Sequence, residues 1–597
     1  MTAPGLELEA RHAARAAAAE KLDRSHARVA GVRLALVVAA LALAAWGWTR
    51  DGVSWRGEGA LAAVFVFVAL WHERVERRRD RARLARDFYA GALRRVAGDW
   101  PRASDESFAD ERHPYARDLD VVGEPSLLAR LDTCQTRLGT ATLAGWLLAP
   151  ADAAEVALRQ AAARELSPKL DFREELAVAG ARADGPGADV ARAIAWAAAE
   201  PPLPAGALWR AGAALVAIAT AALVAAAFEG AIASTIAWAA VAVQLAALRL
   251  LRERLRDAAL GAEAGERGLQ RAIELVARVE REPFAAPGLA RRAERLRRVP
   301  AAELRRLASL AELLESRANL VVAVLRPVLL WDVNVALALA AWRRRVGPAL
   351  GDALAALAEI EALAALGTFA HENPAYAWPE VRDHGAAFVA TALAHPLLKP
   401  GRAVANDVCV GEPGSVALVT GSNMAGKSTL LRAVGCNAAL ALCGAPVAAA
   451  SLAMRACQLA TSMRVHDSLD EATSLFFAEV KRLKAVVELA GGLRPVLFLL
   501  DEILLGTNSL ERGLGARAVV KRLSDAGAAG LVSTHDLQLA ALDTDLPGRV
   551  TFAHFESSLV GGKLAFDYLL RPGLATATNA LAILRAEGLV PPDAAGR

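Results

Sequence analysis

The sequence lacks paired cysteines and a strong excess of charge of one sign. The chain of 597 residues holds five cysteines, and none of them forms a C-x-x-C pair. Cys436 and Cys443 could share a helix face, but no histidine lies near them, so buried free thiols are expected rather than a metal site. This is the cysteine usage of a reduced, cytoplasmic protein. The formal net charge is only +4, which does not by itself indicate nucleic-acid binding.

Apolar sequence is present in excess. Apolar residues make up 55% of the chain, whereas charged residues, at 22%, are close to the usual share. A chain of this length can hold several domains and a large core. Alanine raises the apolar average, so the local apolar runs are more informative than the mean.

Residues 419–432, VTGSNMAGKSTLLR, fit the phosphate-binding pattern G-x-x-x-x-G-K-[ST]. An apolar strand precedes the loop and a helix follows it, as the motif requires, which disfavours a chance match by a glycine-rich turn. Backbone N–H groups and the helix N-terminus then point at the phosphates. We expect Lys427 to neutralise the β and γ oxygens and the Ser428 hydroxyl to bind Mg²⁺. The predicted ATP-binding residues are Gly421, Ser422, Asn423, Met424, Ala425, Gly426, Lys427, Ser428 and Thr429.

A second apolar run supplies the other half of such a site. Residues 495–500, PVLFLL, read as a buried parallel strand that ends in Asp501 and Glu502. Asp501 can hold Mg²⁺ through water, and Glu502 can position or deprotonate the attacking water. Residues 530–534 predict another strand that delivers His535 to the same sheet edge, where it can bond the γ-phosphate; a structural histidine is the alternative. The sequence therefore predicts an ATPase with Glu502 and His535 as catalytic residues.

The residues around these motifs resemble the MutS family. The segment TGSNMAGKST carries the family's Asn-Met pair, DSLDEATSLFFAEV (467–480) resembles its signature, and LLDEILLGTNS resembles its Walker B and D-loop. STHDLQLA resembles the histidine switch, and the stretch from Phe566, FDYLLRPGLATATNALAILRAEGLVP, resembles the closing helical segment. Upstream, SLLARLDTCQTRLGTATLAGWLLAP (126–150) is similar to the start of the family's helical core. The resemblance covers about residues 115–200 and 350–590.

The resemblance implies an α/β ABC-type P-loop ATPase domain at the C-terminus, preceded by an all-α MutS-like core and lever region. It also implies ATP and Mg²⁺ as cofactors and DNA as a partner. In this family the signature of one subunit completes the site of the other, which implies a homodimer in which Ser474 reaches the opposite γ-phosphate. Two departures bear on that geometry: Ala472 stands at the signature glycine position, and Leu504-Leu505 replaces the usual Gly-Arg pair.

A mismatch-reading domain is not expected. Family members that read mismatches wedge an aromatic side chain into DNA beside a Phe-x-Glu motif, using a domain that precedes the core. Here only about 110 residues precede the core match, and much of that length is apolar. The motif Phe477-Ala478-Glu479 lies inside the ATPase signature instead.

Four apolar segments predict two membrane hairpins: residues 34–49 with 59–71, and 211–228 with 230–248. A spanning helix needs about 20 apolar residues, with a lower limit near 17, so the second pair is long enough and the first is short. Arginines flank the open end of each hairpin, as the positive-inside rule requires when both ends are cytoplasmic. Two buried alanine-rich hairpins are the alternative; a signal peptide is disfavoured because the first segment starts late and lacks a good cleavage site.

Two further segments are interpreted without a membrane span. The run ERVERRRDRARLAR (73–86) is expected to be a solvated helix facing anionic lipid headgroups rather than a nucleic-acid patch. Residues 320–342 contain Arg326, Pro327, Asp332 and Asn334, and they are expected to pack in the core.

The expected organisation has six parts. They are a basic N-terminal helix (1–33), a first apolar hairpin (34–71), the first part of the helical core (72–206), a second apolar hairpin (207–250), a returning lever helix with the second part of the core (251–385), and the ATPase domain (386–597). The predicted protein is a multi-pass, membrane-associated MutS-like ATPase of a bacterial-type inner membrane, with its core and ATPase domains in the cytoplasm. The alternatives are a membrane scaffold or remodelling ATPase without a DNA role, and an ABC-like transporter, for which four short spans offer little pathway.

Overall fold

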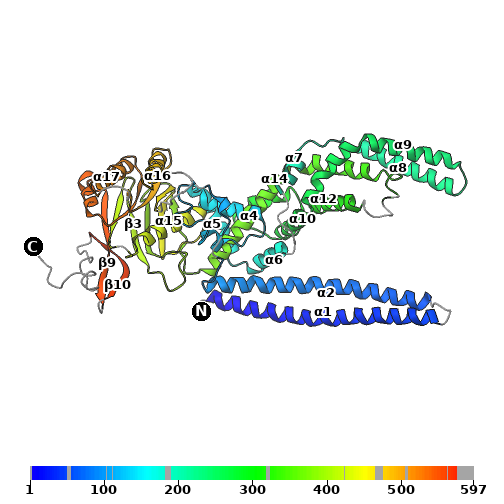
Figure 1. Cartoon of the computed structure of the whole chain (residues 1–597), viewed down its shortest axis with the longest axis horizontal. Helices are drawn as coiled ribbons and strands as arrows, with labels where there is room; N and C mark the ends of the chain where they lie inside the picture. Colours follow the sequence, from blue (N-terminus) through cyan, green and yellow to red (C-terminus); the bar gives the residue numbers. More distant parts are fainter. Residues whose placement is uncertain are drawn as a thin grey trace, which may run out of the picture.

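The computed structural model describes residues 3–574, apart from 50–54, 102–103, 111, 182–189, 317–322, 324, 423, 464–474, 505–508 and 561–562. The described chain is elongated. An α/β domain lies at one end, a helical core lies in the middle, and two helical hairpins reach the other end (Figure 1).

The first hairpin consists of two long antiparallel helices, α1 (Ala3–Thr49) and α2 (Trp55–Val96). Helix α1 continues through residue 33, so the expected boundary between a basic helix and an apolar segment falls inside one helix. At the base of the hairpin, Leu8, Tyr89 and Ala92 are buried against Leu170 of the core. Toward the tip the apolar side chains are exposed instead, as at Leu41 and Phe67.

The helical core is built around α14 (Trp331–Glu372), whose 42 residues pack against most of the other core helices. Trp342 is fully buried there, in agreement with the core packing predicted for this part of residues 320–342. The α7–α14 crossing is so close that a Cβ added at Gly347 would lie 2.0 Å from the carbonyl oxygen of Ala197, so only glycine fits. The remaining core helices are α3 (Leu127–Leu131), α4 (Arg137–Leu148), α5 (Ala153–Leu166), α6 (Leu170–Ala181), α7 (Val190–Ala198), α10 (Arg252–Glu280), α11 (Pro287–Arg297) and α12 (Ala301–Glu315), with the short 3-10 helix η1 (Glu106–Phe108) before them.

The segment that returns from the second hairpin was expected to form a lever helix, but it is divided into two helices. Helix α10 ends at Glu280, and α11 begins only at Pro287. Proline suits the first position of a helix but cannot continue a preceding one, which explains why a new helix starts here.

The second hairpin, α8 (Ala207–Phe228) and α9 (Ser234–Leu250), leaves the core and returns to it. Its helices are joined by a buried hydrogen bond of 2.7 Å from Gln244 Nε2 to Thr220 Oγ1. Most of its large apolar side chains point outward, and Ile218, Trp238 and Val243 are each at least 66% exposed.

Three described helices, α1, α8 and α14, are long and apolar enough to cross a membrane, and the bent pair α9–α10 would make a fourth. These helices differ in how much of their apolar surface is buried inside the protein. In α14, 83% of the most apolar window is buried inside the protein, whereas the share is 6% in α1 and 11% in α8. Helix α14 is therefore a core helix, and the apolar surfaces of α1 and α8 face outward.

The α/β domain holds two sheets. The larger has the strand order β10-β9-β4-β8-β7-β6, in which β10 alone is antiparallel to its neighbour; the smaller has the order β1-β5-β2-β3. The strands are β1 (Glu380–Arg382), β2 (Phe388–Leu393), β3 (Asn406–Val410), β4 (Val416–Thr420), β5 (Ser451–Arg455), β6 (Gln458–Ser462), β7 (Val496–Asp501), β8 (Ala529–Thr534), β9 (Val550–Val560) and β10 (Lys563–Pro572). The helices are α15 (Lys427–Cys443), α16 (Leu475–Ala490), α17 (Ser509–Asp525), η3 (Leu537–Ala541) and α18 (Leu542–Asp545).

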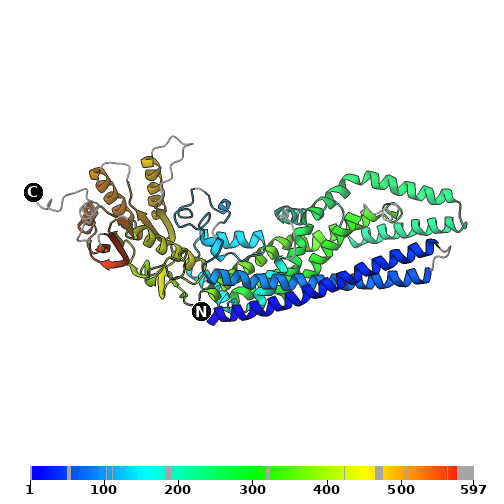
Figure 2. The same ribbon diagram turned by 60° about the horizontal axis from the view of Figure 1, so that its bottom comes forward.

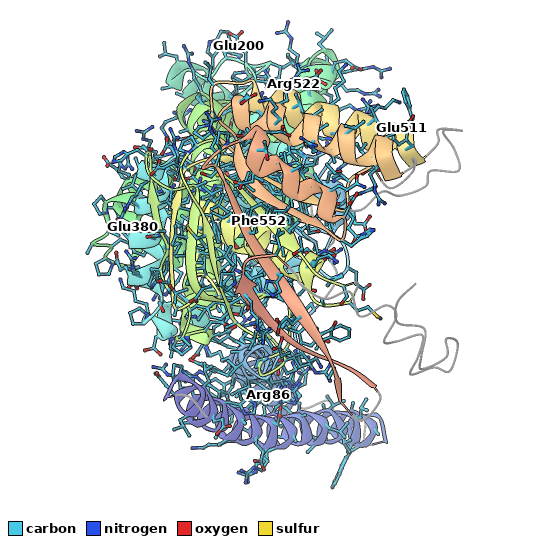
Figure 3. All side chains as sticks on the ribbon, turned by 90° about the vertical axis from the view of Figure 1, so that its left-hand side faces the viewer. Arg86, Glu200, Glu380, Glu511, Arg522 and Phe552 are labelled. Carbon is cyan, nitrogen blue, oxygen red and sulfur yellow. The ribbon has the colours of Figure 1, made fainter. Side chains whose placement is uncertain are left out.

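One continuous apolar cluster joins this domain to the core. Helix α15 is buried along nearly its whole length between the sheets and the core segments 115–147 and 362–369. In the end-on view of Figure 3, Phe552 of β9 lies near the centre of the domain, α17 with Glu511 and Arg522 lies above it, and the first hairpin lies below at Arg86. The α/β domain is thus packed directly on the core.

Strand β10 includes residues that were expected from the sequence to be helical. The closing segment from Phe566 was expected to be helical, but Phe566–Pro572 belong to β10, and the part beyond residue 574 lies outside the described residues. The alternating positions of this stretch pair with β9, where the backbone hydrogen bonds are supplied by the neighbouring strand.

Candidate nucleotide-binding site

The carboxyl ends of three parallel strands bring the predicted site residues to one sheet edge. Strand β4 lies between β9 and β8 and leads into the loop 421–426, β7 ends at Asp501, and β8 ends just before His535. Ligands of open α/β sheets bind at this edge. The structure therefore places the glycine-rich loop, Asp501, Glu502 and His535 around a common point.

Lys427 is held beneath the loop. Its side chain is only 5% exposed, and its Nζ donates to the carbonyl oxygens of Gly421, at 2.9 Å, and Ser422, at 3.1 Å. The same Nζ lies 3.4 Å from Oε1 of Glu502. The ammonium group is thus desolvated and already placed on the loop, with partners that phosphate oxygens can replace.

Glu502 contacts two other residues of the site, Lys427 and His535. Besides Lys427, its Oε1 lies 3.2 Å from Nδ1 of His535. Its N–H donates to the carbonyl oxygen of Ser533 at 3.1 Å, which extends the pairing of β7 with β8 by one residue. Next to it, the carboxylate of Asp501 accepts a hydrogen bond from the Ser533 hydroxyl. Strand β8 therefore fixes the carboxylate of Asp501 and the backbone of Glu502.

The backbone that carries Glu502 is left-handed. Glu502 has φ +45° and Leu504 has φ +62°, a region that non-glycine residues rarely adopt and that persists only where neighbours hold it. Here Oε1 of the buried Glu479 accepts a hydrogen bond of 2.5 Å from the N–H of Leu504. This contact fixes the turn directly after the catalytic candidate.

Tyr568 was missed by the sequence reasoning. A Cβ added at Gly426, which has φ +106°, would lie 3.2 Å from Cδ1 of Tyr568, so the tyrosine ring lies against the phosphate-binding loop. The side chain of Asn406 fixes this position, because it donates to the carbonyl oxygen of Tyr568 at 3.0 Å and accepts from the N–H of Leu570 at 2.7 Å. The available signal was the aromatic residue in FDYLL, but that stretch was expected to be helical.

Ser428 and Asp501 are the side chains that could hold Mg²⁺. Ser428 is exposed in the first turn of α15, and Asp501 lies at the end of β7. Within the described part of the chain no three His, Cys, Asp or Glu side chains gather into a metal site. An Mg²⁺ ion there would depend on these two oxygens, the phosphates and water, which is the usual coordination of Mg²⁺ at nucleotide sites.

Several predicted residues lie outside the described part of the chain: Asn423 of the loop, Ala472 and Ser474 of the signature, and Leu505. The other loop residues are described, with Ala425 buried and Met424 exposed at φ +70°. Cys436 and Cys443 are buried free thiols, as expected, and so is Cys457; burial raises the pKa of the Cys443 thiol to about 12. None of these three thiols is placed for reactivity.

The fold and the site together define a P-loop nucleotide-binding domain of the α/β type. Residues 417–593 match the family model of MutS domain V. The chain is 30% identical over 254 residues to the DNA mismatch repair protein MutS 2 of Halobacterium salinarum, covering 42% of this chain and 29% of that protein. It is 35% identical over 208 residues to the endonuclease MutS2 of Thermomicrobium roseum, covering 34% and 26%. With the DNA mismatch repair protein MutS of Chloroflexus aurantiacus it is 31% identical over 246 residues, covering 40% and 25%.

These similarities relate the C-terminal part of the chain to MutS domain V, and the chain to proteins named MutS and MutS2. The chain spans less than a third of the length of the relatives it matches. The match to the family model lies in the C-terminal domain that carries the nucleotide site.

Proposed function

We propose that the chain is a membrane-anchored, MutS-like ATPase that binds and hydrolyses ATP with Mg²⁺, works as a homodimer, and acts in a process related to DNA repair. The observation that carries the ATPase proposal is the contact of Glu502 Oε1 with both Lys427 and His535 at the mouth of the phosphate-binding loop. Phosphoryl transfer needs a counter-charge and a group that orients the attacking water, and these residues supply both.

Each residue has a separate role in this proposal. Lys427 exchanges its carbonyl partners for the β and γ oxygens of ATP. Glu502, released from that lysine, orients or deprotonates the attacking water, and His535 bonds the γ-phosphate. Ser428 and Asp501 would hold Mg²⁺, which supplies further neutralisation of the phosphate charge.

The homodimer and the DNA partner rest on similarity to the MutS family. Ser474, at the signature serine position, is proposed to reach the γ-phosphate in the opposite subunit. Relatives named as DNA mismatch repair proteins support a role on DNA.

Membrane anchoring is supported by the exposure and the placement of the two hairpins. The apolar surfaces of α1 and α8 are almost wholly unburied. Exposed apolar surface of this extent is rare on soluble monomers and marks an interface or a membrane contact. The tips of both hairpins lie at the same end of the molecule, away from the α/β domain, in the view of Figure 1 and in the turned view of Figure 2. A single bilayer could therefore receive both.

The charges give the proposed orientation. Exposed arginines lie at the bases of the two apolar hairpin segments: Arg28 and Arg74 at the base of 34–71, within α1 and α2, and Arg249 and Arg252 at the base of 211–248. By the positive-inside rule these bases are cytoplasmic, which leaves the core and the ATPase domain in the cytoplasm of a bacterial-type inner membrane. The exposed arginines would then face anionic lipid headgroups.

A second candidate is a membrane scaffold or remodelling ATPase without a DNA role. The observation that favours it is the composition of the second hairpin, which projects from the core with no Lys or Arg between residues 211 and 248. Contacts with the DNA backbone come mainly from basic and polar side chains, so this projection does not suit a phosphate-binding tip.

One experiment separates the two candidates. The full-length protein is reconstituted in nanodiscs, and its ATPase rate is measured with duplex DNA, with added anionic lipid, and with neither. Stimulation by DNA that weakens with salt supports the repair-related function, whereas stimulation by lipid alone supports the scaffold. The Lys427→Ala variant is the control, and a variant rate equal to that of the wild type would show that the activity comes from another site.

A further inference from the structure

Two polar side chains of helix α16, one turn apart, form hydrogen bonds with other parts of the protein. Glu479 and Arg482 are three residues apart and therefore lie on the same face of the helix. Arg482 bonds to a residue from the helical core, and Glu479 bonds to the backbone just after Glu502. Of these two contacts one is directed toward the core and the other toward the nucleotide site; Arg482 Nε also donates to the carbonyl oxygen of Thr461 in β6 at 3.1 Å.

The core contact is made by Asp118, which is 0% exposed. A single oxygen, Oδ2, accepts hydrogen bonds from Arg482 Nη2 at 2.7 Å, from Thr461 Oγ1 at 2.7 Å and from the N–H of Met463 at 3.0 Å. The N–H of Thr461 also donates to the carbonyl oxygen of Pro114 at 3.0 Å. Residues 114–118 therefore join the end of the edge strand β6 to α16.

Burying the Asp118 carboxylate costs free energy, and the three hydrogen bonds to its Oδ2 offset that cost. A buried carboxylate loses its hydration on folding, and charge-assisted hydrogen bonds of good geometry are what compensate for the loss. The three donors come from β6, from the residue following it and from α16, so the carboxylate fixes their relative positions. Moving α16 would break the pair between Asp118 and Arg482.

The site contact ends beside the catalytic candidate. Glu479, 5% exposed, accepts the N–H of Leu504, two residues after Glu502. Because Glu502 and Leu504 are both left-handed, the turn depends on such contacts to keep its shape. A shift of α16 would therefore change the position of the Glu502 carboxylate.

We infer that Asp118 is a positioning residue for ATP hydrolysis, acting on Glu502 through Arg482, helix α16, Glu479 and Leu504. This inference rests on the proposed ATPase function. These contacts connect the helical core to Glu502, the residue proposed to orient the attacking water. Because both hairpins are attached to the core, a movement of the hairpins can change the position of Glu502. Misplacement of a catalytic group by about 1 Å can cost about a hundredfold in rate, so a partial loosening has a measurable effect.

The test uses the full-length protein and steady-state ATPase kinetics. Asp118→Ala and Arg482→Met should each lower kcat about tenfold while the KM for ATP stays unchanged, because the phosphate-binding loop is not on the path. Asp118→Asn should stay within about twofold of the wild type. Among the described residues Oδ1 of Asp118 has no hydrogen-bond partner, so the asparagine can turn its NH₂ there and keep its oxygen on the three donors.

A double-mutant cycle tests the path itself. Glu479→Met should lower kcat as Asp118→Ala does, and the double variant should be no slower than the slower single variant, because both changes release the same element. Arg517→Met is the matched control. It removes an ion pair of 2.7 Å with Asp545 in the same domain but outside the path, and it should keep the wild-type kcat.

The outcomes are separable. A wild-type kcat in Asp118→Ala would overturn the inference, as would a similar loss in Arg517→Met, equal losses in Asp118→Ala and Asp118→Asn, or a fully additive cycle. If Asp118→Ala does not fold, Arg482→Met decides alone, because the Arg482 side chain is 28% exposed and its loss disturbs less of the core. A wild-type protein without ATPase activity would instead refute the proposed function, and the inference with it.

Discussion

At the scale of single residues, the site is a set of charged groups that neutralise one another before any nucleotide binds. Nζ of Lys427 lies 3.4 Å from Oε1 of Glu502. Lys427 also donates to the carbonyl oxygen of Gly421, and Glu502 also contacts His535. Binding of ATP should transfer the lysine to the phosphates and free one side of the glutamate. The resting contact therefore links nucleotide binding to the release of the proposed catalytic carboxylate.

The first prediction concerns that carboxylate. Glu502→Gln should lower kcat about a hundredfold or more, because an amide cannot accept the proton of the attacking water. Affinity for ATP should be kept or slightly raised, because the change removes a negative charge beside Lys427. Single-turnover hydrolysis and fluorescent-nucleotide binding measure the two quantities. Glu511→Gln, at an exposed position of α17, is the control, and equal rates in the two variants would remove Glu502 from the mechanism.

A second residue-scale prediction concerns Glu361 of α14. Its carboxyl accepts hydrogen bonds from the N–H of Gln135 at 2.8 Å and from the Thr136 hydroxyl at 2.5 Å, and its burial raises the pKa from 4.5 to about 7. The folded state therefore favours the protonated form. The contribution of Glu361 to the free energy of unfolding is therefore fully present below pH 4.5 and is lost as the pH rises through about 7. The pKa shift corresponds to a loss of about 3 kcal/mol.

Thermal unfolding checks this prediction. Between pH 5 and pH 8 the midpoint of the wild type should fall, whereas Glu361→Gln, which cannot ionise, should show a smaller fall. Glu303→Gln, at a half-buried position of α12 paired with the exposed Arg345, is the control and should follow the wild type. A parallel pH dependence in all three proteins would mean that Glu361 is ionised in the fold throughout.

The sequence predicted the residues that lie within one motif and missed those that act across the chain. The glycine-rich loop, Asp501, Glu502 and His535 each follow a strand whose apolar run is visible locally. Asp118 and Arg482 are separated by more than 350 positions and meet only because the core packs on β6. No periodicity or spacing in one sequence carries that information.

At the scale of elements, apolar run length predicted where the hairpins lie but not how long their helices are. Helices α1 and α2 continue far beyond their apolar segments, because the flanking sequence is rich in alanine and arginine, which are both strong helix formers. An ion pair between the two helices, Arg83 with Asp23 at 2.6 Å, supports the polar part. In the apolar part, described side chains such as Leu41 and Phe67 point outward.

The element-scale prediction concerns the surface of the second hairpin. Ala222 of α8 is exposed, so an arginine there meets no steric obstacle. If α8 lies in lipid, Ala222→Arg should cost about 2.5 to 3.5 kcal/mol and weaken insertion, which a glycosylation or protease-protection assay of the tip measures. Ala222→Leu should insert at least as well as the wild type. Unchanged insertion with arginine would place this face of the hairpin in water.

At the scale of the whole molecule, the nucleotide-binding site and the exposed tips of the hairpins lie at opposite ends of the described chain (Figure 1), and helix α14 contacts helices of both hairpins. Helix α14 runs through the core and ends at Glu372, just before β1 of the α/β domain. There Arg95 of α2 pairs with Glu372 through three contacts, of 2.7, 2.9 and 3.1 Å. The base of the first hairpin is thus fixed to the same end of α14 that leads into the nucleotide-binding domain.

The first whole-molecule prediction concerns assembly. If Ser474 completes the opposite site, ATP should join two copies, and Glu502→Gln should keep them joined because hydrolysis is slow. Light scattering of the detergent-solubilised variant should therefore show twice the protein mass with ATP and Mg²⁺ as without nucleotide. Adding Ser474→Ala to this variant should weaken the dimer. A strictly monomeric Glu502→Gln protein at saturating ATP would exclude this mechanism.

The last prediction concerns location. Arginine contacts with lipid headgroups are screened by salt, whereas an inserted hairpin is held by the transfer of its apolar side chains out of water. Membranes from cells that express residues 1–597 are therefore washed with high salt and then with alkaline carbonate. The protein should stay with the lipid through both washes, and a variant with 207–250 replaced by a short polar loop should be retained less well, because only the shorter first hairpin remains. Recovery of the folded, ATP-binding wild type in the soluble fraction without detergent would exclude membrane anchoring. The exposed apolar faces of α1 and α8 would then have to be covered by another protein surface.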